Sequence, residues 1–304
     1  MTGARDAAHV RPAAAGLLRL ESEDSLRAWR ASLSPGARVG FVPTMGALHG
    51  GHASLVARAR EECEAVLASI FVNPMQFEDS GDLDRYPRTL DADCRVLEDL
   101  GATAVYLPDP VDVYPEGFQV SVDPGPLADR FEGAARPGHF AGVLTVVLKL
   151  FQRTGARRAY FGEKDAQQLF LVRRMARDLD LPVEVLPCPT VREADGLAMS
   201  SRNARLVAAD REDALLLWQA LQVARSLFAA GERDVDVLEA AMRACFEGGT
   251  AELAYAAIVD DAAFDRPGAD ATRTAGARGA PWRAIVAARV AGTHLLDNLA
   301  LGRP

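Results

Sequence analysis

The chain has 304 residues, of which 49% are hydrophobic and 25% are charged. These values are typical of one large or two ordinary globular domains, and they differ from those of a disordered or membrane protein. The net charge of -8, with arginines scattered along the chain, argues against binding to nucleic acid or to an anionic membrane. It still allows a local positive pocket for a small anion.

The cysteines indicate a reducing compartment. Cys63, Cys94, Cys188 and Cys245 are far apart and form no CxxC pair, so neither a disulfide framework nor a structural zinc site is expected. The sequence shows no long apolar segment of a signal peptide and no run near the ~20 apolar residues of a membrane span. We therefore expect a cytoplasmic protein, with residues 1–13 as a loose tail.

Strand and helix patterns alternate through the first two-thirds of the chain. Strands are expected at 39–44, 66–72, 103–107, 158–161 and 183–186, and helices at 51–65, 90–100, 140–152 and 167–178. Residues 108–138 are rich in Pro and Gly and are expected to be mostly loop, with room for one strand at 119–122. The alternation predicts an α/β fold with a doubly wound, Rossmann-like parallel sheet. Ligands bind such sheets outside the carboxyl ends of the strands.

The pattern changes after about residue 187. Helices are expected at 209–230 and 235–246, followed by strands at 252–259, 282–289 and 293–299, with a flexible loop at 265–280. This order predicts a smaller α+β domain. We therefore predict a first domain at 1–187 and a C-terminal domain at 188–304.

The first motif, Pro43–His52 (PTMGALHGGH), joins the first of these strands to its helix. Its glycines let the backbone approach a ligand, and the helix start supplies N–H donors and a positive dipole end. His49 and His52 could donate to phosphate oxygens. Alternatives are two loop histidines, a zinc site that lacks the Glu of HExxH and a third ligand, or a general-base pair that lacks a nucleophile. The phosphate interpretation is favoured.

The second motif, Phe71–Phe77 (FVNPMQF), follows the next strand. The amides of Asn73 and Gln76 offer both donors and acceptors, which suit a hydroxyl-bearing acid. The alternative is an ordinary polar turn, with Met75 and Phe77 in the core.

The third motif, Phe161–Gln168 (FGEKDAQQ), also follows a strand and opens a helix. Lys164 beside Asp165 could hold a phosphate and its bound Mg²⁺. The alternative is a solvated charge pair at a helix start.

The fourth motif, Arg192–Asn203 (READGLAMSSRN), follows the last strand of the predicted sheet. The hydroxyls of Ser200 and Ser201 and the guanidinium fork of Arg202 could grip a triphosphate or departing pyrophosphate. The alternative is a capped helix start with a surface arginine. The sequence has no GxSxG elbow, so a serine nucleophile is not expected.

These four motifs, in this order, and the segment 287–301 (AARVAGTHLLDNLAL) resemble the pantothenate synthetase family of HxGH nucleotidyltransferases. The resemblance extends from about residue 16 to 301. It implies an ATP-dependent ligase that joins pantoate to β-alanine through a pantoyl adenylate, with release of AMP and pyrophosphate. It also implies a homodimer that acts in coenzyme A biosynthesis, with small-molecule substrates and no nucleic-acid or membrane partner.

The resemblance assigns roles to individual residues. The catalytic residues would be His49, His52 and Lys164. The ATP-binding residues would be Met45, His49, His52, Gly162, Lys164, Asp165, Met199, Ser200, Ser201 and Arg202. The pantoate-binding residues would be Met45, Asn73, Gln76 and Gln168. Mg²⁺ would be carried by ATP rather than held directly by the protein, and Arg136 and His139 would lie in a loop near the site.

Two features depart from the family pattern. Gly50 stands between the histidines where Glu is common, and residues 265–280 form an insert rich in Ala, Gly and Arg. Two rival functions stay open: a nucleotidyltransferase that transfers AMP to a phosphate, and a silent binding protein with the same fold. About a hundred residues follow the Met-Ser-Ser segment, which disfavours the first, and the intact His49 and Lys164 disfavour the second. Small size and acidic charge disfavour an aminoacyl-tRNA synthetase.

Overall fold

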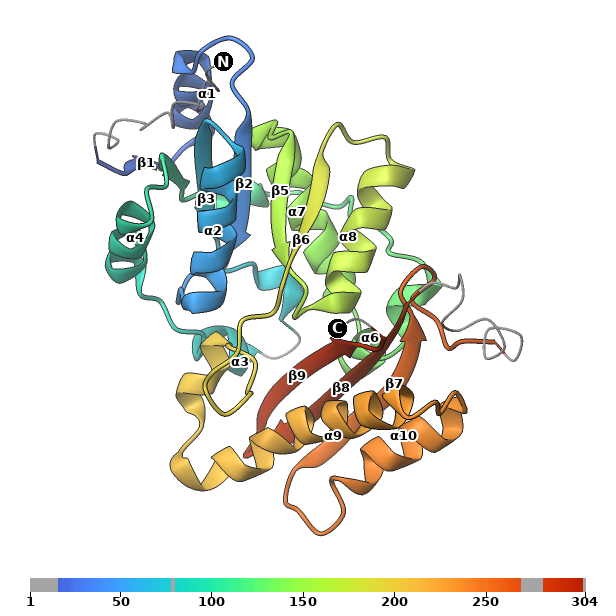
Figure 1. The fold of residues 1–304 in the computed structure, drawn as a ribbon. Coiled ribbons are helices and arrows are strands. Elements are labelled where there is room, and N and C mark those ends of the chain that lie inside the picture. Colours follow the sequence, from blue (N-terminus) through green and yellow to red (C-terminus); the bar gives the residue numbers. More distant parts are fainter. Residues whose placement is uncertain (1–15, 78–79, 269–280, 303–304) are drawn as a thin grey trace, which may run out of the picture.

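The computed structural model describes residues 16–77, 80–268 and 281–302. Two sheets organise these residues (Figure 1). The larger sheet has six parallel strands in the order β1-β4-β3-β2-β5-β6, with bounds β1 Leu18–Leu20, β2 Val39–Thr44, β3 Ala65–Ile70, β4 Ala104–Tyr106, β5 Arg158–Gly162 and β6 Glu184–Cys188. From β2 the chain builds β3 and β4 on one side, and β5 and β6 later extend the sheet on the other side. The strand order thus reverses between β2 and β5, where ligand sites are expected.

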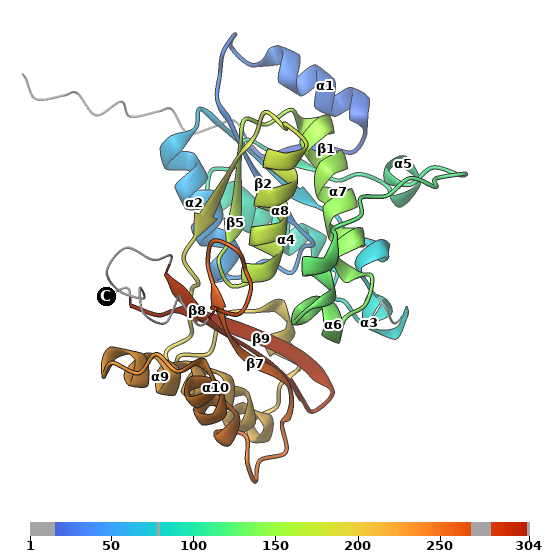
Figure 2. The ribbon, with the colours of Figure 1, turned by 90° about the vertical axis from the view of Figure 1, so that its right-hand side faces the viewer.

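Helices cover both faces of this sheet (Figure 2). One face carries α2 (Gly50–Glu62) and α4 (Leu90–Asp99), and the other carries α1 (Glu23–Ser32), α7 (His139–Thr154) and α8 (Ala166–Asp178). Neighbouring residues of β2 serve the two faces, because side chains alternate along a strand: Phe41 packs in one core and Val42 in the other. The predicted doubly wound α/β fold is confirmed.

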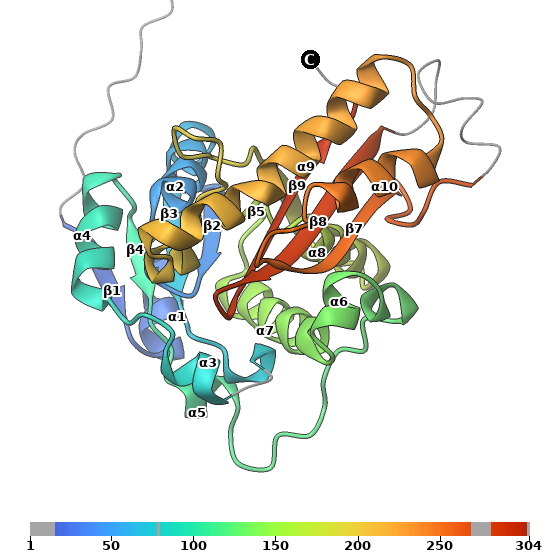
Figure 3. The same ribbon diagram turned by 90° about the horizontal axis from the view of Figure 1, so that it is seen from below.

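The smaller sheet contains the antiparallel strands β7 (Glu252–Asp260), β8 (Trp282–Val290) and β9 (Thr293–Ala300). Helices α9 (Arg211–Ala229) and α10 (Val235–Ala244) pack on one face (Figure 3). Its other face contacts the first part of the chain through a small apolar cluster that joins Val259 and Ile285 to Ala166 and Phe170. This arrangement agrees with the predicted α+β character of the C-terminal region.

Short helical turns connect these elements. They are α3 (Ser80–Asp84), α5 (Pro110–Val113) and α6 (Glu132–Ala135), and the 3-10 turns η1 (Pro74–Gln76), η2 (Pro126–Asp129), η3 (Ser201–Arg205) and η4 (Ala208–Asp210). Of these, η1 and η3 border the candidate active site, and α3 and α6 border a neighbouring cavity.

Several predictions of local structure differ from the structure. No strand forms at 119–122: Val120 is 83% exposed, and the backbone N–H of Val122 donates to Thr145 Oγ1 instead of to a neighbouring strand. Helix α2 ends at Glu62 rather than at residue 65, because Cys63 is already extended. The sequence interpretation missed β1 and α1, which offer weak signals: β1 is a three-residue strand at the sheet edge, and α1 buries only two side chains.

The predicted domain boundary falls at the end of β6, where Cys188 still pairs with the larger sheet. The predicted tail at 1–13 and residues 269–280 of the predicted loop lie outside the described residues. None of the helices in the described ranges is long and apolar enough to cross a membrane.

Candidate active site

A cavity of about 220 Å³ opens at the carboxyl ends of β2, β3 and β5. It therefore lies where the strand order reverses. Every residue that the sequence predicted to contact ATP or pantoate lines it: Met45, His49, His52, Asn73, Gln76, Gly162, Lys164, Asp165, Gln168, Met199, Ser200, Ser201 and Arg202. Motifs that are far apart in the sequence thus surround one space.

The two histidines of the first motif cap helix α2. His49 is the N-cap residue, and its Nδ1 accepts from the backbone N–H of Gly51 at 3.1 Å. His52 lies three positions later, and its Nδ1 accepts from the backbone N–H of His49 at 3.3 Å. The HxxH spacing thus reproduces a capping box with imidazoles. Because both Nδ1 atoms accept, we assign the ring proton of each to Nε2, which can donate to a ligand.

Burial makes these imidazoles poor bases. It lowers the pKa of His52 to about 3, with a contribution from His49. Burial and the neighbouring Lys164 also lower the pKa of His49. His52 is therefore neutral at neutral pH, and it can act as a hydrogen-bond donor but not as a cation.

A buried carboxylate on α4 fixes the loop before the histidines. Asp93 accepts from the backbone N–H groups of Ala47 at 2.9 Å and Leu48 at 2.8 Å, and from Thr89 Oγ1 at 3.1 Å. The backbone of Ala47 is left-handed, with φ at 50°. A Cβ atom at Gly46 would lie 3.0 Å from Asp93 Oδ2, so glycine permits this close approach. The sequence interpretation missed Asp93, because nothing in its helical pattern indicates a partner 45 residues away.

The amides of the second motif form a connected group. Gln76 Nε2 lies 2.9 Å from Met45 Sδ, and Gln76 Oε1 accepts from Asn73 Nδ2 at 3.1 Å. Asn73 Nδ2 also donates to the carbonyl of Gly142, and Asn73 Oδ1 accepts from Tyr114 Oη at 2.7 Å. Asn73 is 1% exposed. Its amide is thus engaged by the protein, whereas its neighbour Gln76 faces the cavity with Met45.

Arg136 and His139 also line this cavity. Arg136 Nη2 donates to the backbone carbonyl of Gln76 at 3.0 Å, and His139 Nδ1 lies 2.9 Å from the same oxygen. Burial and the charge of Arg136 lower the pKa of His139 to about 4, so this imidazole is neutral and donates from Nδ1. The loop before α7 therefore packs directly on the second motif.

The cavity lining carries a surplus of positive charge. Arg136, Lys164 and Arg202 line the cavity, and Asp165 is the one carboxylate among its lining residues. Lys164 Nζ lies 3.6 Å from Asp165 Oδ1, and Arg202 Nη2 lies 3.3 Å from Asp82 Oδ2. This surplus of positive charge suits a polyanionic ligand.

Ser200 caps the turn η3, and Ser201 is its first residue. Ser200 Oγ accepts from the backbone N–H of Arg202 at 3.2 Å, and Ser201 Oγ lies 3.3 Å from the hydroxyl of Tyr86. Tyr86 is buried and lines the cavity, and the sequence interpretation missed it.

The C-terminal sheet holds the loop of Lys164. Asn298 on β9 donates from Nδ2 to the backbone carbonyls of Glu163 at 2.8 Å and Lys164 at 2.7 Å. The preceding Asp297 forms a two-pronged ion pair with Arg192 at 2.6 and 3.0 Å. Neither role was predicted, although two adjacent polar residues flanked by leucines in the strand were a visible signal.

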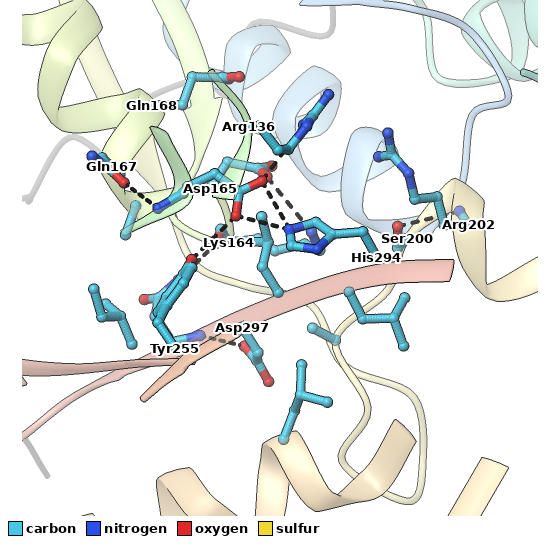
Figure 4. A pocket seen from close by; sticks show the side chains of 18 of the residues that line it. Arg136, Lys164, Asp165, Gln167, Gln168, Ser200, Arg202, Tyr255, His294 and Asp297 are labelled. Atoms are coloured by element: carbon cyan, nitrogen blue, oxygen red, sulfur yellow. Dashed lines mark hydrogen bonds and ion pairs between the residues drawn. The ribbon is translucent and has the colours of Figure 1, made fainter. Parts of the chain in front are cut away.

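A smaller cavity of about 60 Å³ is lined by residues from both the first part of the chain and the C-terminal sheet (Figure 4). Glu132 on α6 is buried there, with its carboxylate 2.9 Å from His294 Nε2 on β9 and 3.3 Å from the hydroxyl of Tyr255 on β7. Burial would raise the pKa of Glu132, but His294 and the nearby Arg136 lower it to about 2. A charged group thus joins the two parts of the molecule.

Metal ligands do not gather in the part of the chain that the structure describes: no group of three or more His, Cys, Asp and Glu side chains there could hold an ion.

Comparison with known proteins agrees with this geometry. A family model described as Pantoate-beta-alanine ligase matches residues 19–300. The chain belongs to the pantoate–β-alanine ligase family. The pantothenate synthetase of Ruegeria pomeroyi is 49% identical, over 88% of this chain and 91% of the relative. The pantothenate synthetase of Rubrobacter xylanophilus is 48% identical, over 92% of this chain and 96% of the relative.

Solved members of the pantoate–β-alanine ligase family share the fold. The pantothenate synthetase from Thermus thermophilus superimposes with a TM-score of 0.84 at 44% identity, over 93% of this chain and 99% of the other. The pantoate–β-alanine ligase from Francisella tularensis was solved in complex with beta-gamma ATP and β-alanine. It superimposes with a TM-score of 0.76 at 32% identity, over 94% of this chain and 98% of the other.

The structure shows what surrounds Gly50, the position between the two histidines where Glu is common in the family. A Cβ atom at position 50 would lie 2.9 Å from Met199 Sδ. That atom is near the tip of a flexible side chain, so a larger residue here requires Met199 to move. Gly50 therefore affects the fourth motif as well as the first.

Proposed function

We propose that this protein is an ATP-dependent ligase that joins pantoate to β-alanine. The observation that carries this proposal is the single cavity whose lining combines cationic side chains and capping imidazoles with a group of amides. Such a cavity can hold a polyphosphate next to a hydroxylated acid.

The first step activates the acid. An oxygen of the pantoate carboxylate attacks the α-phosphorus of ATP, and the bond from that phosphorus to the bridging oxygen of pyrophosphate breaks. A carboxylate with a pKa near ~4 is already ionised at neutral pH, so this step needs no general base. Lys164, Ser200, Ser201 and Arg202 bind the phosphates, and the Nε2–H groups of His49 and His52 stabilise the charge that develops.

The second step forms the amide. The neutral amine of β-alanine attacks the acyl carbon of pantoyl adenylate, and the bond from that carbon to the AMP oxygen breaks. Water would hydrolyse the intermediate, so the site must be shielded. We propose that residues 188–304 act as a domain that covers the site together with the 125–139 loop.

The acid lies on the amide side of the cavity. Met45, Gln76 and Gln168 contact pantoate. The side-chain amide of Asn73 is already hydrogen-bonded within the protein, so Asn73 acts by positioning Gln76. On the nucleotide side, Met45, Gly162, Asp165 and Met199 complete the ATP contacts.

Mg²⁺ accompanies ATP. The cavity lining offers the single carboxylate Asp165, which is too little to hold the ion alone, so the phosphates supply most of the ligands. The family likeness further supports a cytoplasmic homodimer.

The test is product analysis with purified protein, ATP, Mg²⁺, pantoate and β-alanine. We expect AMP to form only when both acids are present, whereas pantoate alone should release at most one pyrophosphate per active site, with the adenylate retained. Formation of AMP that is indifferent to pantoate would contradict the proposal, and formation of a dinucleotide would favour an AMP transferase.

A further inference from the structure

A second positively charged cavity lies beside the proposed catalytic cavity. Its volume is about 370 Å³, within the range of about 300–1,000 Å³ that is usual for small-ligand sites. Its charged lining comprises Asp82, Arg85, Arg136, Arg202, Arg205 and Arg289, and His294 also borders it. Five guanidinium groups thus surround one carboxylate, in a chain whose net charge is -8.

The two cavities share a wall. Arg136 and Arg202 line both of them. Arg202 is also one of the residues that we propose to bind the phosphates of ATP. An anion that leaves the phosphate end of the catalytic cavity therefore meets these arginines next.

Two carboxylates pair with three of the five arginines: Glu132, outside the lining, lies 3.5 Å from Arg136, and Asp82 pairs with the other two. Asp82 pairs with Arg205 at 2.8 Å and with Arg202 at 3.3 Å, and Arg205 also donates to the backbone carbonyl of Arg85. Arg289 lies near the end of β8, and its exposed guanidinium forms no hydrogen bond or ion pair with any residue that the structure describes. An anion would therefore gain new charge-assisted hydrogen bonds rather than only replace existing ones.

We propose that this cavity is a second anion site, which takes the inorganic pyrophosphate released from the catalytic cavity. Guanidinium forks bind phosphate oxygens in pairs, so several of them around one space favour a condensed phosphate with multiple charges over a single carboxylate. The source of the anion rests on the proposed ligase function. The binding itself does not, because it depends only on the charges that line the cavity.

The direct test is equilibrium dialysis of labelled pyrophosphate against the full-length protein. Without other ligands we expect two pyrophosphates per chain. With saturating pantoate and α,β-methylene ATP, which fills the catalytic cavity and cannot release pyrophosphate, we expect one. R289Q should weaken this remaining site at least ~10-fold, the scale of losing one charge-assisted hydrogen bond. R205Q removes a second arginine of the same lining and should also weaken binding at this site.

The matched control is R225Q, which removes an exposed arginine from α9 outside this cavity and should leave both sites intact. One pyrophosphate per chain, fully displaced by the analogue, would overturn the inference, as would equal affinities in R289Q and R225Q. Two molecules of labelled analogue per chain would show that a nucleotide, not pyrophosphate, fills the site. A second site that persists in a protein without ligase activity would contradict the proposed function alone.

Discussion

The histidines of the first motif combine a structural role with the chemical role that we propose for them. Their Nδ1 atoms accept from the start of α2, and each Nε2–H is left as a donor. The sequence predicted that they lie at a phosphate-binding helix start, since three glycines and a preceding strand indicate it. The reciprocal capping was not predicted, because histidine is not among the preferred N-cap residues.

The two roles can be separated at His49. Asparagine is a good N-cap residue, so His49→Asn should preserve α2 while the donor to phosphate is lost. We expect adenylate formation to fall at least ~10²-fold, the scale of losing one charge-stabilising donor. The measurement is the initial rate of AMP release together with the thermal unfolding midpoint. An unchanged midpoint with near-normal turnover would refute the assignment.

At the scale of elements, strand ends were the most predictable feature. The motifs after β2, β3 and β5 follow apolar runs that end sharply, and the sheet brings those ends together. Contacts made by side chains from distant elements were not predictable, because spacing within a helix or strand does not reveal its partner. Asp93, Tyr86 and Asn298 belong to this class. The prediction of a strand at 119–122 was wrong, because none of the described strands lies beside this segment to pair with it.

Asp93 links α4 to the loop between β2 and α2. Asp93→Ala leaves two backbone N–H groups without their acceptor, and each unsatisfied buried group costs about 1–3 kcal/mol. We expect a lower free energy of unfolding and a lower kcat, because the loop positions Met45 and His49.

The comparison variants are Asp93→Asn, which keeps one acceptor and should lose less, and Asp91→Asn on the exposed side of the same helix. Denaturant unfolding and steady-state kinetics would measure both effects. Equal behaviour of Asp93→Ala and Asp91→Asn would show that the carboxylate does not hold the loop.

At the scale of the whole molecule, the C-terminal sheet completes the site. Asn298 fixes the loop of Lys164, and the Glu132–His294 pair joins α6 to β9. The sequence predicted a smaller C-terminal α+β domain, but not which of its residues reach the first domain. Those contacts depend on how the two sheets and their helices pack against each other.

The Glu132 carboxylate gives a prediction about pH. Its pKa is lowered from an ordinary 4.5 to about 2, so its stabilising effect is fully present above about pH 4.5 and is lost as pH falls toward 2. The shift corresponds to at most about 3 kcal/mol. Glu132→Gln should therefore unfold more easily at pH 7 and lose less stability between pH 5 and 3 than the unmodified protein.

Denaturant unfolding at several pH values measures this effect, with the exposed Glu116→Gln as control. A Glu132→Gln variant with the same pH slope as the control would show that this pair contributes nothing.

The central claim is that one cavity brings the pantoate carboxylate to the α-phosphorus of ATP. The most direct measurement is oxygen transfer from pantoate labelled with ¹⁸O in its carboxylate, with mass analysis of the products. The mechanism requires one labelled oxygen in AMP and one in the amide product, because the attacking oxygen stays on phosphorus when the amine displaces AMP. Unlabelled AMP, or label in inorganic phosphate, would contradict it.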